Sequence, residues 1–237
     1  MSVPQVSVIM PAHNVECYID EAIQSVLSQR GLSFELLVGD DASSDRTWAR
    51  IQNHLSDSRV RAWKFRFHVG AAVTRNRLIK CARGRYLLFC DSDDALADGH
   101  LSSLVPVLER DATAGVAYGD ILIWDESTGR RNLRRRQMTD AWDLFTYSIG
   151  GPGILVRREL VNRVGGFRSE LPLLHDYDLL LRLAEVTRFR YCPGAPFYFY
   201  RQRPSSLTDR GRNLKDSLTK KIRREAILRR YGYRVPW

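Results

Sequence analysis

The chain has 237 residues, of which 44% are hydrophobic and 27% are charged, and its formal net charge is +10. This composition is typical of a soluble globular protein with enough chain to bury a full hydrophobic core. No apolar run approaches the ~20 residues that a membrane-spanning helix needs, and residues 1–5 lack the basic stretch and apolar core of a signal peptide. We therefore do not expect a membrane-spanning or secreted protein, and we expect this one to be cytoplasmic.

Short apolar runs alternate with segments of helical periodicity through the first half of the chain. Strands are expected at residues 6–10, 34–39, 60–65 and 86–90. Apolar residues at helical spacing predict helices between them, at residues 18–29, 45–55 and 71–82. This β-α-β-α-β-α-β order predicts an α/β fold with a mostly parallel central sheet and helices on both faces.

The second half of the chain is more mixed. Its apolar runs predict strands at residues 116–124, 154–156 and 197–200, with a turn at 125–129 and a basic loop at 130–136. Helices are expected at residues 158–164, 176–186 and 214–231, and the last of these is strongly basic. The sequence contains no internal repeat.

The spacing of the cysteines argues against a zinc-binding or disulfide-bonded protein. The four cysteines, at positions 17, 81, 90 and 192, lie far apart and form no C-x-x-C pair. A zinc site usually needs closely spaced thiolates, so we expect neither zinc nor a disulfide framework.

The excess positive charge is concentrated in the last part of the chain. From Arg201 onward there are 12 Lys/Arg and 3 Asp/Glu, so 12 − 3 = +9 of the net charge lies there. Such a surface can bind nucleic acid, anionic lipid or a phosphorylated substrate, or it can simply be solvated.

Three carboxylates follow the strand at residues 86–90, in the run Asp91, Ser92, Asp93 and Asp94. In a parallel sheet, ligands bind beyond the carboxyl ends of the strands, which is where this run lies. Carboxylates this dense repel one another unless a positive charge lies among them, and Mg²⁺ or Mn²⁺ prefers such oxygen ligands. The alternative is that Ser92, Asp93 or Asp94 caps the next helix, which explains one acidic residue better than three.

A second acidic pair, Asp40 and Asp41, follows the strand at residues 34–39. In one interpretation a carboxylate of this pair accepts a hydrogen bond from a ligand. In the other, the Asp-Asp-x-Ser sequence is a turn that begins a helix. The residues alone leave both interpretations open.

These segments together resemble the inverting family 2 glycosyltransferases, which have a GT-A fold. The resemblance lies in SVIMPAHN at residues 7–14, VGDDASSD at 38–45 and GRYLLFCDSDD at 84–94, and in the segment from Gly70 to Asn76. It continues through Gly165-Gly166-Phe167, HDYDL at 175–179 and Arg182-Leu183, and it covers most of residues 3–205. Each motif is moderately specific, but their order and spacing are highly specific.

The resemblance implies a nucleotide diphosphate sugar as donor and a role for each matching residue. The nucleotide pocket would be formed by Pro11, His13, Asp40, Asp41, Asp91 and Ser92. His13 would stack on the base, Asp41 would accept a hydrogen bond from it, and Asp91 and Ser92 would lie near the ribose. Asp93 would hold the Mn²⁺ or Mg²⁺ ion that bridges the diphosphate.

The resemblance also implies that Asp176 is the general base, which removes the acceptor proton so that the sugar is transferred with inversion. Asp178 is a competitor, but two residues further on it points to a different face of the helix. The alternative is a purely structural role, in which Asp176 only caps this helix.

Two departures from the family affect these roles. His175 precedes Asp176 where the family often has Glu, and Arg203 follows the last core strand where the family often has a metal-binding histidine. Arg203 could bind the diphosphate as a permanent cation, but it cannot ligate metal. The Q-x-x-R-W segment of processive members is absent, so we expect a single addition.

The expected organisation follows from this resemblance. Residues 1–210 would form the GT-A domain, with a nucleotide-binding half at 1–115 and an acceptor half at 116–210, and residues 211–237 a basic helical tail. The acceptor would be a glycan or a lipid-linked sugar, as in polysaccharide or glycolipid biosynthesis. The amphipathic tail would either contact the inner face of the membrane or be a solvated helix packed on the domain.

Two rival functions are weaker. A sugar-phosphate nucleotidyltransferase needs a phosphate loop rich in Gly and Arg after the first strand, where this chain has Pro11-Ala12-His13-Asn14. A nucleic-acid-binding module lacks a recognisable motif here, and acidic strand ends would repel phosphate. We therefore expect no nucleic-acid partner.

Overall fold

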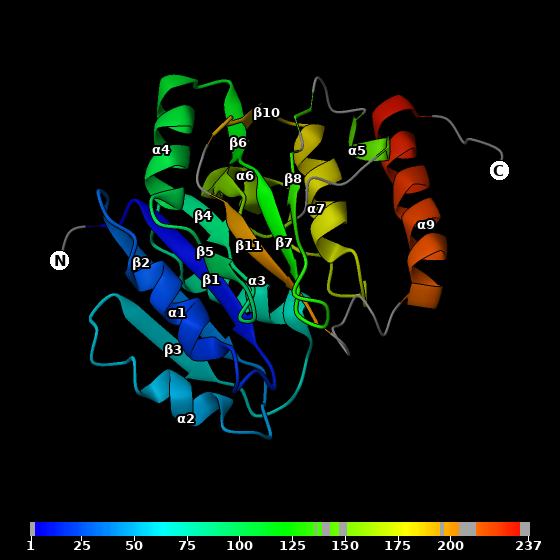
Figure 1. Ribbon diagram of the computed structural model, residues 1–237. Coiled ribbons are helices and arrows are strands. Elements are labelled where there is room, and N and C mark those ends of the chain that lie inside the picture. Colours follow the sequence, from blue (N-terminus) through cyan, green and yellow to red (C-terminus); the bar gives the residue numbers. More distant parts are fainter. Residues whose placement is uncertain are drawn as a thin grey trace.

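The computed structural model describes residues 3–135, 137–138, 143–146, 151–194, 197–203 and 212–232. Seven strands form a central sheet in the order β10-β6-β9-β4-β1-β2-β3 (Figure 1). They are β1 (Val6–Ala12), β2 (Phe34–Asp40), β3 (Val60–Lys64), β4 (Tyr86–Phe89), β6 (Ala114–Tyr118), β9 (Leu155–Arg157) and β10 (Arg188–Tyr191). Pairing is parallel throughout β4-β1-β2-β3, and only β9 runs antiparallel to its neighbours. The predicted boundary between residues 210 and 211, and residue 136 of the predicted basic loop, lie outside the described residues.

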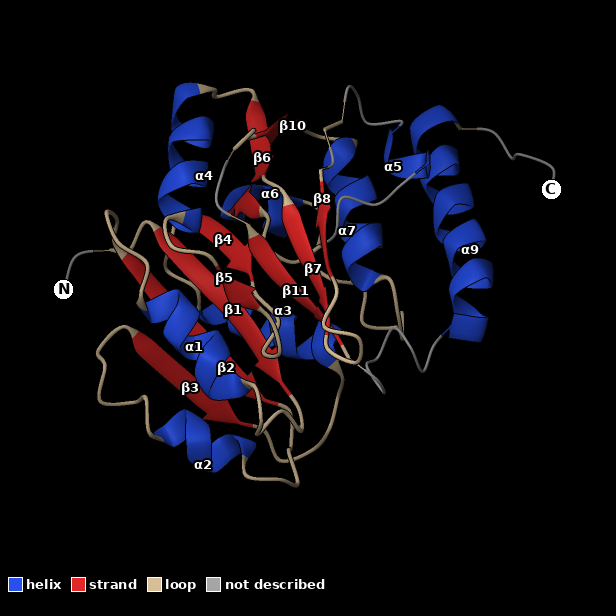
Figure 2. Cartoon of the chain, in the orientation of Figure 1, coloured by secondary structure: helices blue, strands red, loops and turns tan. Residues whose placement is uncertain are grey.

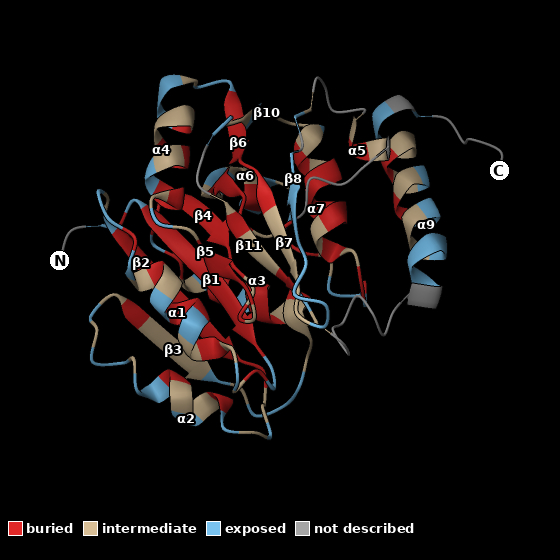
Figure 3. Ribbon diagram, viewed as in Figure 1, coloured by how far each residue is buried: buried red, intermediate tan, exposed pale blue. Residues whose placement is uncertain are grey.

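Helices cover both faces of this sheet (Figure 2). Alternate residues of β1 point to opposite faces, so Val8 and Met10 pack on one side and Ile9 on the other. The first side holds α1 (Ile19–Leu27), α2 (Thr47–Gln52) and α4 (His100–Arg110), and the second holds α3 (Ala71–Cys81), α6 (Arg158–Arg163) and α7 (His175–Ala184). All seven residues of β1 are buried, as Figure 3 shows, because both faces of the strand are covered.

A second sheet of four strands, in the order β5-β11-β7-β8, was not predicted. Its strands are β5 (Ala95–Leu96), β11 (Tyr198–Gln202), β7 (Ile121–Asp125) and β8 (Arg131–Arg134). The predicted single strand at residues 116–124 is wrong, because the chain leaves the central sheet after β6 and enters the second sheet as β7. The buried Asp120 lies at this crossing, where its carboxylate accepts a hydrogen bond from the Tyr191 hydroxyl at 2.5 Å. The predicted basic loop at 130–136 is also wrong in part, since β8 pairs antiparallel with β7.

The basic tail helix is present as α9 (Arg212–Tyr231), which lies beside α7 (Figure 1). Ile222 and Ala226 of α9 are buried in the same core cluster as the apolar residues of α7. Arg229, in the last turn of α9, forms an ion pair at 2.9 Å with Glu185, which follows the last residue of α7. The apolar face of α9 is therefore packed on the domain, and its basic face is outermost. Within the described part of the chain, no helix is both long and apolar enough to cross a membrane.

Candidate active site

The predicted site residues come together at the carboxyl ends of β1, β2 and β4. In the register of the sheet, Ala12 at the end of β1 is the partner of Asp40 at the end of β2. The backbone N–H of Asp41 donates to the carbonyl of Ala12 at 2.8 Å, and that of Cys90 donates to the carbonyl of Ile9 at 3.1 Å. The segments after these strands therefore lie next to one another, and buried Pro11 and Ser92 belong to this edge.

The two acidic residues after β2 have different surroundings. Asp41 is 2% exposed, and its carboxylate accepts hydrogen bonds from the backbone N–H groups of Val69 and Gly70 at 2.9 and 2.8 Å. It thereby fixes the loop between β3 and α3. Asp40 is 0% exposed: its Oδ1 accepts from the Ser43 N–H at 3.2 Å, and its Oδ2 has no partner among the described residues. Both carboxylate oxygens of Asp41 therefore accept hydrogen bonds within the protein, whereas Oδ2 of Asp40 accepts none from the described residues.

His13 contacts a residue that sequence reasoning missed. Its ring contacts that of His68, with the ring centroids 4.0 Å apart and the ring planes inclined by 34°. Both Nδ1 atoms lie within hydrogen-bond distance of the Asp41 carbonyl oxygen, at 2.8 Å for His13 and 3.2 Å for His68. His68 belongs to none of the motifs described above, and its position beside His13 is visible only in the folded structure.

The acidic run after β4 is neutralised by protein side chains. Arg75 donates to the carboxylate of Asp91, and Arg203 Nε donates to that of Asp93 at 2.7 Å. Asp94 is 2% exposed and accepts from the Tyr198 hydroxyl and from a backbone N–H, each at 2.7 Å. Burial raises the pKa of Asp94 well above its usual range, and the neighbouring carboxylates raise it further. The density of carboxylates therefore does not by itself require a metal ion, because arginines from distant positions supply positive charge.

The residues of this edge could hold a divalent metal ion only if substrate phosphates and water supplied most of its ligands. Among the described residues, no group of three or more His, Cys, Asp or Glu side chains could hold an ion on its own. Arg203 is the one described side chain that binds the carboxylate of Asp93, whose side chain is 21% exposed. A single accessible carboxylate suits Mg²⁺ or Mn²⁺ when substrate phosphates and water complete the coordination. The protein's part of a metal site would be Asp93.

Asp176 lies in the first turn of α7. Its partly exposed carboxylate has no hydrogen-bond partner among the described residues, and it lines a small open pocket together with Arg75, Phe89, Gly151, Pro152, Ile154, Phe167 and Leu179. The capping alternative is wrong, because Leu174 is the N-cap residue and no side chain caps this helix. A Cβ on Gly151 would lie 2.2 Å from that of Asp176, so only glycine leaves room for this side chain.

Arg75 contacts both the acidic run after β4 and the start of α7. Besides binding Asp91, its guanidinium donates to Nε2 of His175 at 2.5 Å. His175 is the residue before Asp176, and its pKa is lowered to about 4 by burial and by the positive charge of Arg75. The ring is therefore neutral at pH 7 and can accept the arginine's hydrogen bond. This contact places the acidic turn after β4 next to the start of α7.

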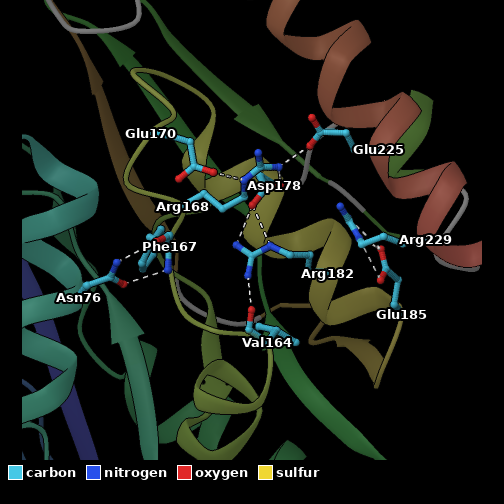
Figure 4. A network of polar contacts seen from close by, with 10 residues as sticks. All are labelled: Asn76, Val164, Phe167, Arg168, Glu170, Asp178, Arg182, Glu185, Glu225 and Arg229. Atoms are coloured by element: carbon cyan, nitrogen blue, oxygen red, sulfur yellow. Dashed lines mark hydrogen bonds and ion pairs between the residues drawn. The ribbon is translucent and has the colours of Figure 1, made fainter.

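Asp178, the competitor of Asp176, is 0% exposed and belongs to an ion-pair network (Figure 4). Its carboxylate lies 2.7 Å from Arg182 of the same helix and 3.4 Å from Arg168. Arg168 also pairs with Glu225 of α9. Asp178 thus connects three segments and has no access to the pocket.

Replacing Asp178 by asparagine should therefore destabilise the fold. Loss of this buried charge leaves the largely buried Arg182 without its ionic partner and removes one of the partners of Arg168, which costs about 3 kcal/mol of unfolding free energy. Urea unfolding monitored by circular dichroism measures this loss. Asp176→Asn is the matched control and should unfold within about 0.5 kcal/mol of the wild type, as is usual for a side chain without partners. Equal stability of the Asp178→Asn variant and the wild type would contradict the structural role.

Comparison with known proteins gives consistent matches. Residues 7–165 match the family model described as glycosyl transferase family 2. The UDP-Glc:alpha-D-GlcNAc-diphosphoundecaprenol beta-1,3-glucosyltransferase WfgD of Escherichia coli is 32% identical over 180 residues, which cover 76% of this chain and 68% of the relative. The chain spans about two thirds or less of the length of the curated relatives that it matches.

Two solved structures share the fold. TarS of S. aureus in complex with UDP-GlcNAc has a TM-score of 0.74 and 20% identity, covering 97% of this chain and 73% of TarS. The mannosyltransferase PcManGT of Pyrobaculum calidifontis, in complex with GDP-Man and Mn²⁺, has a TM-score of 0.69 and 19% identity, covering 93% of this chain and 64% of PcManGT. These matches confirm the predicted fold class and the family resemblance, while the roles of individual residues stay predictions.

Proposed function

The chain belongs to glycosyl transferase family 2, and from this membership we propose that it transfers a sugar from a nucleotide diphosphate donor to an acceptor hydroxyl. The observation that carries the proposal is the contact of Arg75 with both Asp91 and His175. Through it, the acidic strand end lies beside the pocket that contains Asp176, as a donor site beside an acceptor site requires.

The donor would bind at the ends of β1, β2 and β4. We propose that its nucleotide occupies the edge formed by Pro11, His13, Asp40, Asp41, Asp91 and Ser92. The neighbouring structures support a donor of this class, since they are complexes with UDP-GlcNAc and GDP-Man.

Asp93 is proposed to hold Mn²⁺ or Mg²⁺ when the donor is bound. Such an ion would neutralise the negative charge that develops on the departing diphosphate. Arg203, which already contacts Asp93, would add a permanent positive charge close to the same diphosphate. The complex of PcManGT with Mn²⁺ supports a metal in this fold.

Asp176 is proposed to act as the general base. Its carboxylate has no partner among the described residues and lines the pocket, so it is available to accept a proton from an acceptor hydroxyl. The attacking oxygen would approach from the side opposite the diphosphate, and a single displacement of this kind inverts the anomeric configuration. Gly151 leaves the space that this side chain needs.

The acceptor is proposed to be a glycan or a lipid-linked sugar, to which one sugar is added. WfgD is named as a glucosyltransferase that acts on GlcNAc-diphosphoundecaprenol, which supports polysaccharide or glycolipid biosynthesis as the setting. We further propose a cytoplasmic location with peripheral contact at the inner face of the membrane. Because the apolar face of α9 is packed on α7, this contact would be electrostatic, through the basic outer face.

A panel of nucleotide diphosphate sugars tests the proposed activity. The purified protein is incubated with each donor, Mn²⁺ and a lipid-diphosphate sugar acceptor, and release of the nucleoside diphosphate is measured. We expect turnover with one donor class, and nuclear magnetic resonance should show that the new linkage has the anomeric configuration opposite to that of the donor. Consumption of no donor would contradict the proposed activity, and a retained configuration would contradict Asp176 as a base acting in a single displacement.

A further inference from the structure

We propose that Arg223 of α9 is a positioning residue for Asp176, on which it acts through the hydroxyl group of Tyr177. This inference rests on the proposed function, because it takes Asp176 as the general base. It gives one arginine of the basic tail helix a role at the pocket, apart from the basic residues on the outer face of that helix.

The first turn of α7, which carries Asp176, has little local support. No side chain caps this helix, and its N-cap residue Leu174 has φ of 58°, a left-handed conformation that residues other than glycine rarely adopt. Such a conformation persists only where surrounding contacts hold it. The Asp176 carboxylate has no hydrogen-bond partner among the described residues, so its position depends on how the neighbouring residues are held.

Tyr177, the residue after Asp176, is anchored at its hydroxyl group. The side chain is 4% exposed, and burial raises the pKa of this hydroxyl, which therefore keeps its proton. The hydroxyl donates to the backbone carbonyl of Leu144 at 2.6 Å and accepts a hydrogen bond from Nε of Arg223 at 3.0 Å. Arg223 lies 46 residues further along the chain. The tail helix therefore helps to fix the turn that contains Asp176.

The packing of α9 brings Arg223 to this position. Ile222, the preceding residue, is fully buried and belongs to the same core cluster as Tyr177. Arg223 is itself partly buried, whereas Lys221 and Arg224 are exposed. Arg223 thus faces α7, unlike the outer basic residues of the same helix.

Arg75 makes a similar contact on the other side of Asp176. Its guanidinium donates to His175, the residue before Asp176, while Arg223 binds the residue after it. A base removes a proton efficiently only when it lies within hydrogen-bond reach of the attacking hydroxyl, so a small displacement slows the reaction. Loss of the Arg223 contact should therefore slow sugar transfer without weakening donor binding, which is proposed to occur at the ends of β1, β2 and β4.

The single-turnover rate of sugar transfer tests this role. It is measured with Mn²⁺, the donor that the panel identifies and a short-chain lipid-diphosphate sugar, in the absence of membranes. Arg223→Leu should lower this rate about tenfold, since misplacing a reacting group by about 1 Å can cost about a hundredfold. Its affinity for the donor, measured by titration calorimetry, should stay within about twofold of the wild type. Arg223→Lys can still donate to the Tyr177 hydroxyl, so it should recover most of the rate.

Two further variants give a second measurement and a control. Tyr177→Phe keeps the ring and its packing but loses the hydroxyl, so it should also be slow. Adding Arg223→Leu to it should slow it no further, because Arg223 acts through that hydroxyl. Glu185→Gln is the control: it breaks the ion pair between Glu185 and Arg229, which also joins α7 and α9 but lies at the opposite end of α7 from Asp176. This variant should transfer sugar at the wild-type rate.

The inference is overturned if Arg223→Leu transfers sugar at the wild-type rate, if its rate and donor affinity fall together, or if Glu185→Gln is slowed to the same degree. It is also overturned if Arg223→Lys is as slow as Arg223→Leu. Should circular dichroism show that Arg223→Leu does not fold, a wild-type rate in Tyr177→Phe overturns the inference and a slow one supports it. A wild type that consumes no donor contradicts the proposed function itself, and this inference fails with it.

Discussion

Replacing Asp176 by asparagine should lower turnover about a thousandfold while leaving the affinity for the donor within about twofold of the wild type. Asparagine has nearly the same shape but cannot take up a proton, and Asp176 has no partner among the described residues whose loss would disturb the fold. Turnover is measured as release of the nucleoside diphosphate with acceptor present. Donor affinity is measured separately by titration calorimetry without acceptor.

The outcome that would contradict this role is a variant with wild-type turnover. A parallel loss of turnover and donor affinity would instead indicate that Asp176 binds the donor and does not act as the base. Asp178→Asn helps to interpret the result, because Asp178 lies two positions further along α7 and is buried in ion pairs. Its substitution should affect stability, whereas that of Asp176 should affect chemistry.

Replacing Asp93 by alanine should weaken Mn²⁺-dependent binding of the donor's nucleoside diphosphate by about a hundredfold, since an ion with few protein ligands depends strongly on each of them. The side chain is 21% exposed and pairs only with Arg203 among the described residues, so its removal should leave the fold intact. Calorimetric titration with Mn²⁺, and again with a chelator, measures the metal-dependent part of the affinity.

The Arg203→Gln variant is the companion of this experiment. It removes the positive charge beside Asp93 and keeps the carboxylate, so the binding that remains should still depend on Mn²⁺. If Asp93→Ala binds the nucleotide as the wild type does, with the same dependence on Mn²⁺, Asp93 is not the metal ligand. If both variants bind normally, the diphosphate lies elsewhere.

The first half of the fold could be predicted because local pattern and burial agree there. Strands β1, β2 and β4 are mainly apolar, as a strand covered on both faces needs to be, and β1 and β2 are interrupted only by Ser7, Glu35 and the terminal Asp40. The run at residues 116–124 was misleading for the same reason. It is apolar except at Gly119 and Asp120, and this short break does not by itself indicate that the chain passes there from one sheet to the other. The change of sheet is fixed by contacts with β10 and β11.

The sequence could predict which residues of the candidate site lie together, but not the contacts that they make. The sequence predicted that the acidic residues after the parallel strands lie at one edge of the sheet, and the topology does bring those strand ends together. The partners of these residues come from far along the chain: Arg203 is 110 residues from Asp93, and His175 is 100 residues from Arg75. Local spacing holds no information on such pairs. The charge balance of the acidic run and the ring contact between His13 and His68 therefore emerged only from the structure.

Crystallography can test whether the ends of β1, β2 and β4 bind a nucleoside diphosphate together with a divalent ion held by Asp93. Crystals of the protein are grown with Mn²⁺ and the nucleoside diphosphate that binds best, and anomalous diffraction at the manganese edge is recorded. We predict an anomalous peak about 2.2 Å from a carboxylate oxygen of Asp93, as expected for Mn²⁺–oxygen coordination, with diphosphate oxygens on its other side. A nucleotide bound away from the ends of β1, β2 and β4, or a peak that is absent from Asp93, would contradict this proposal.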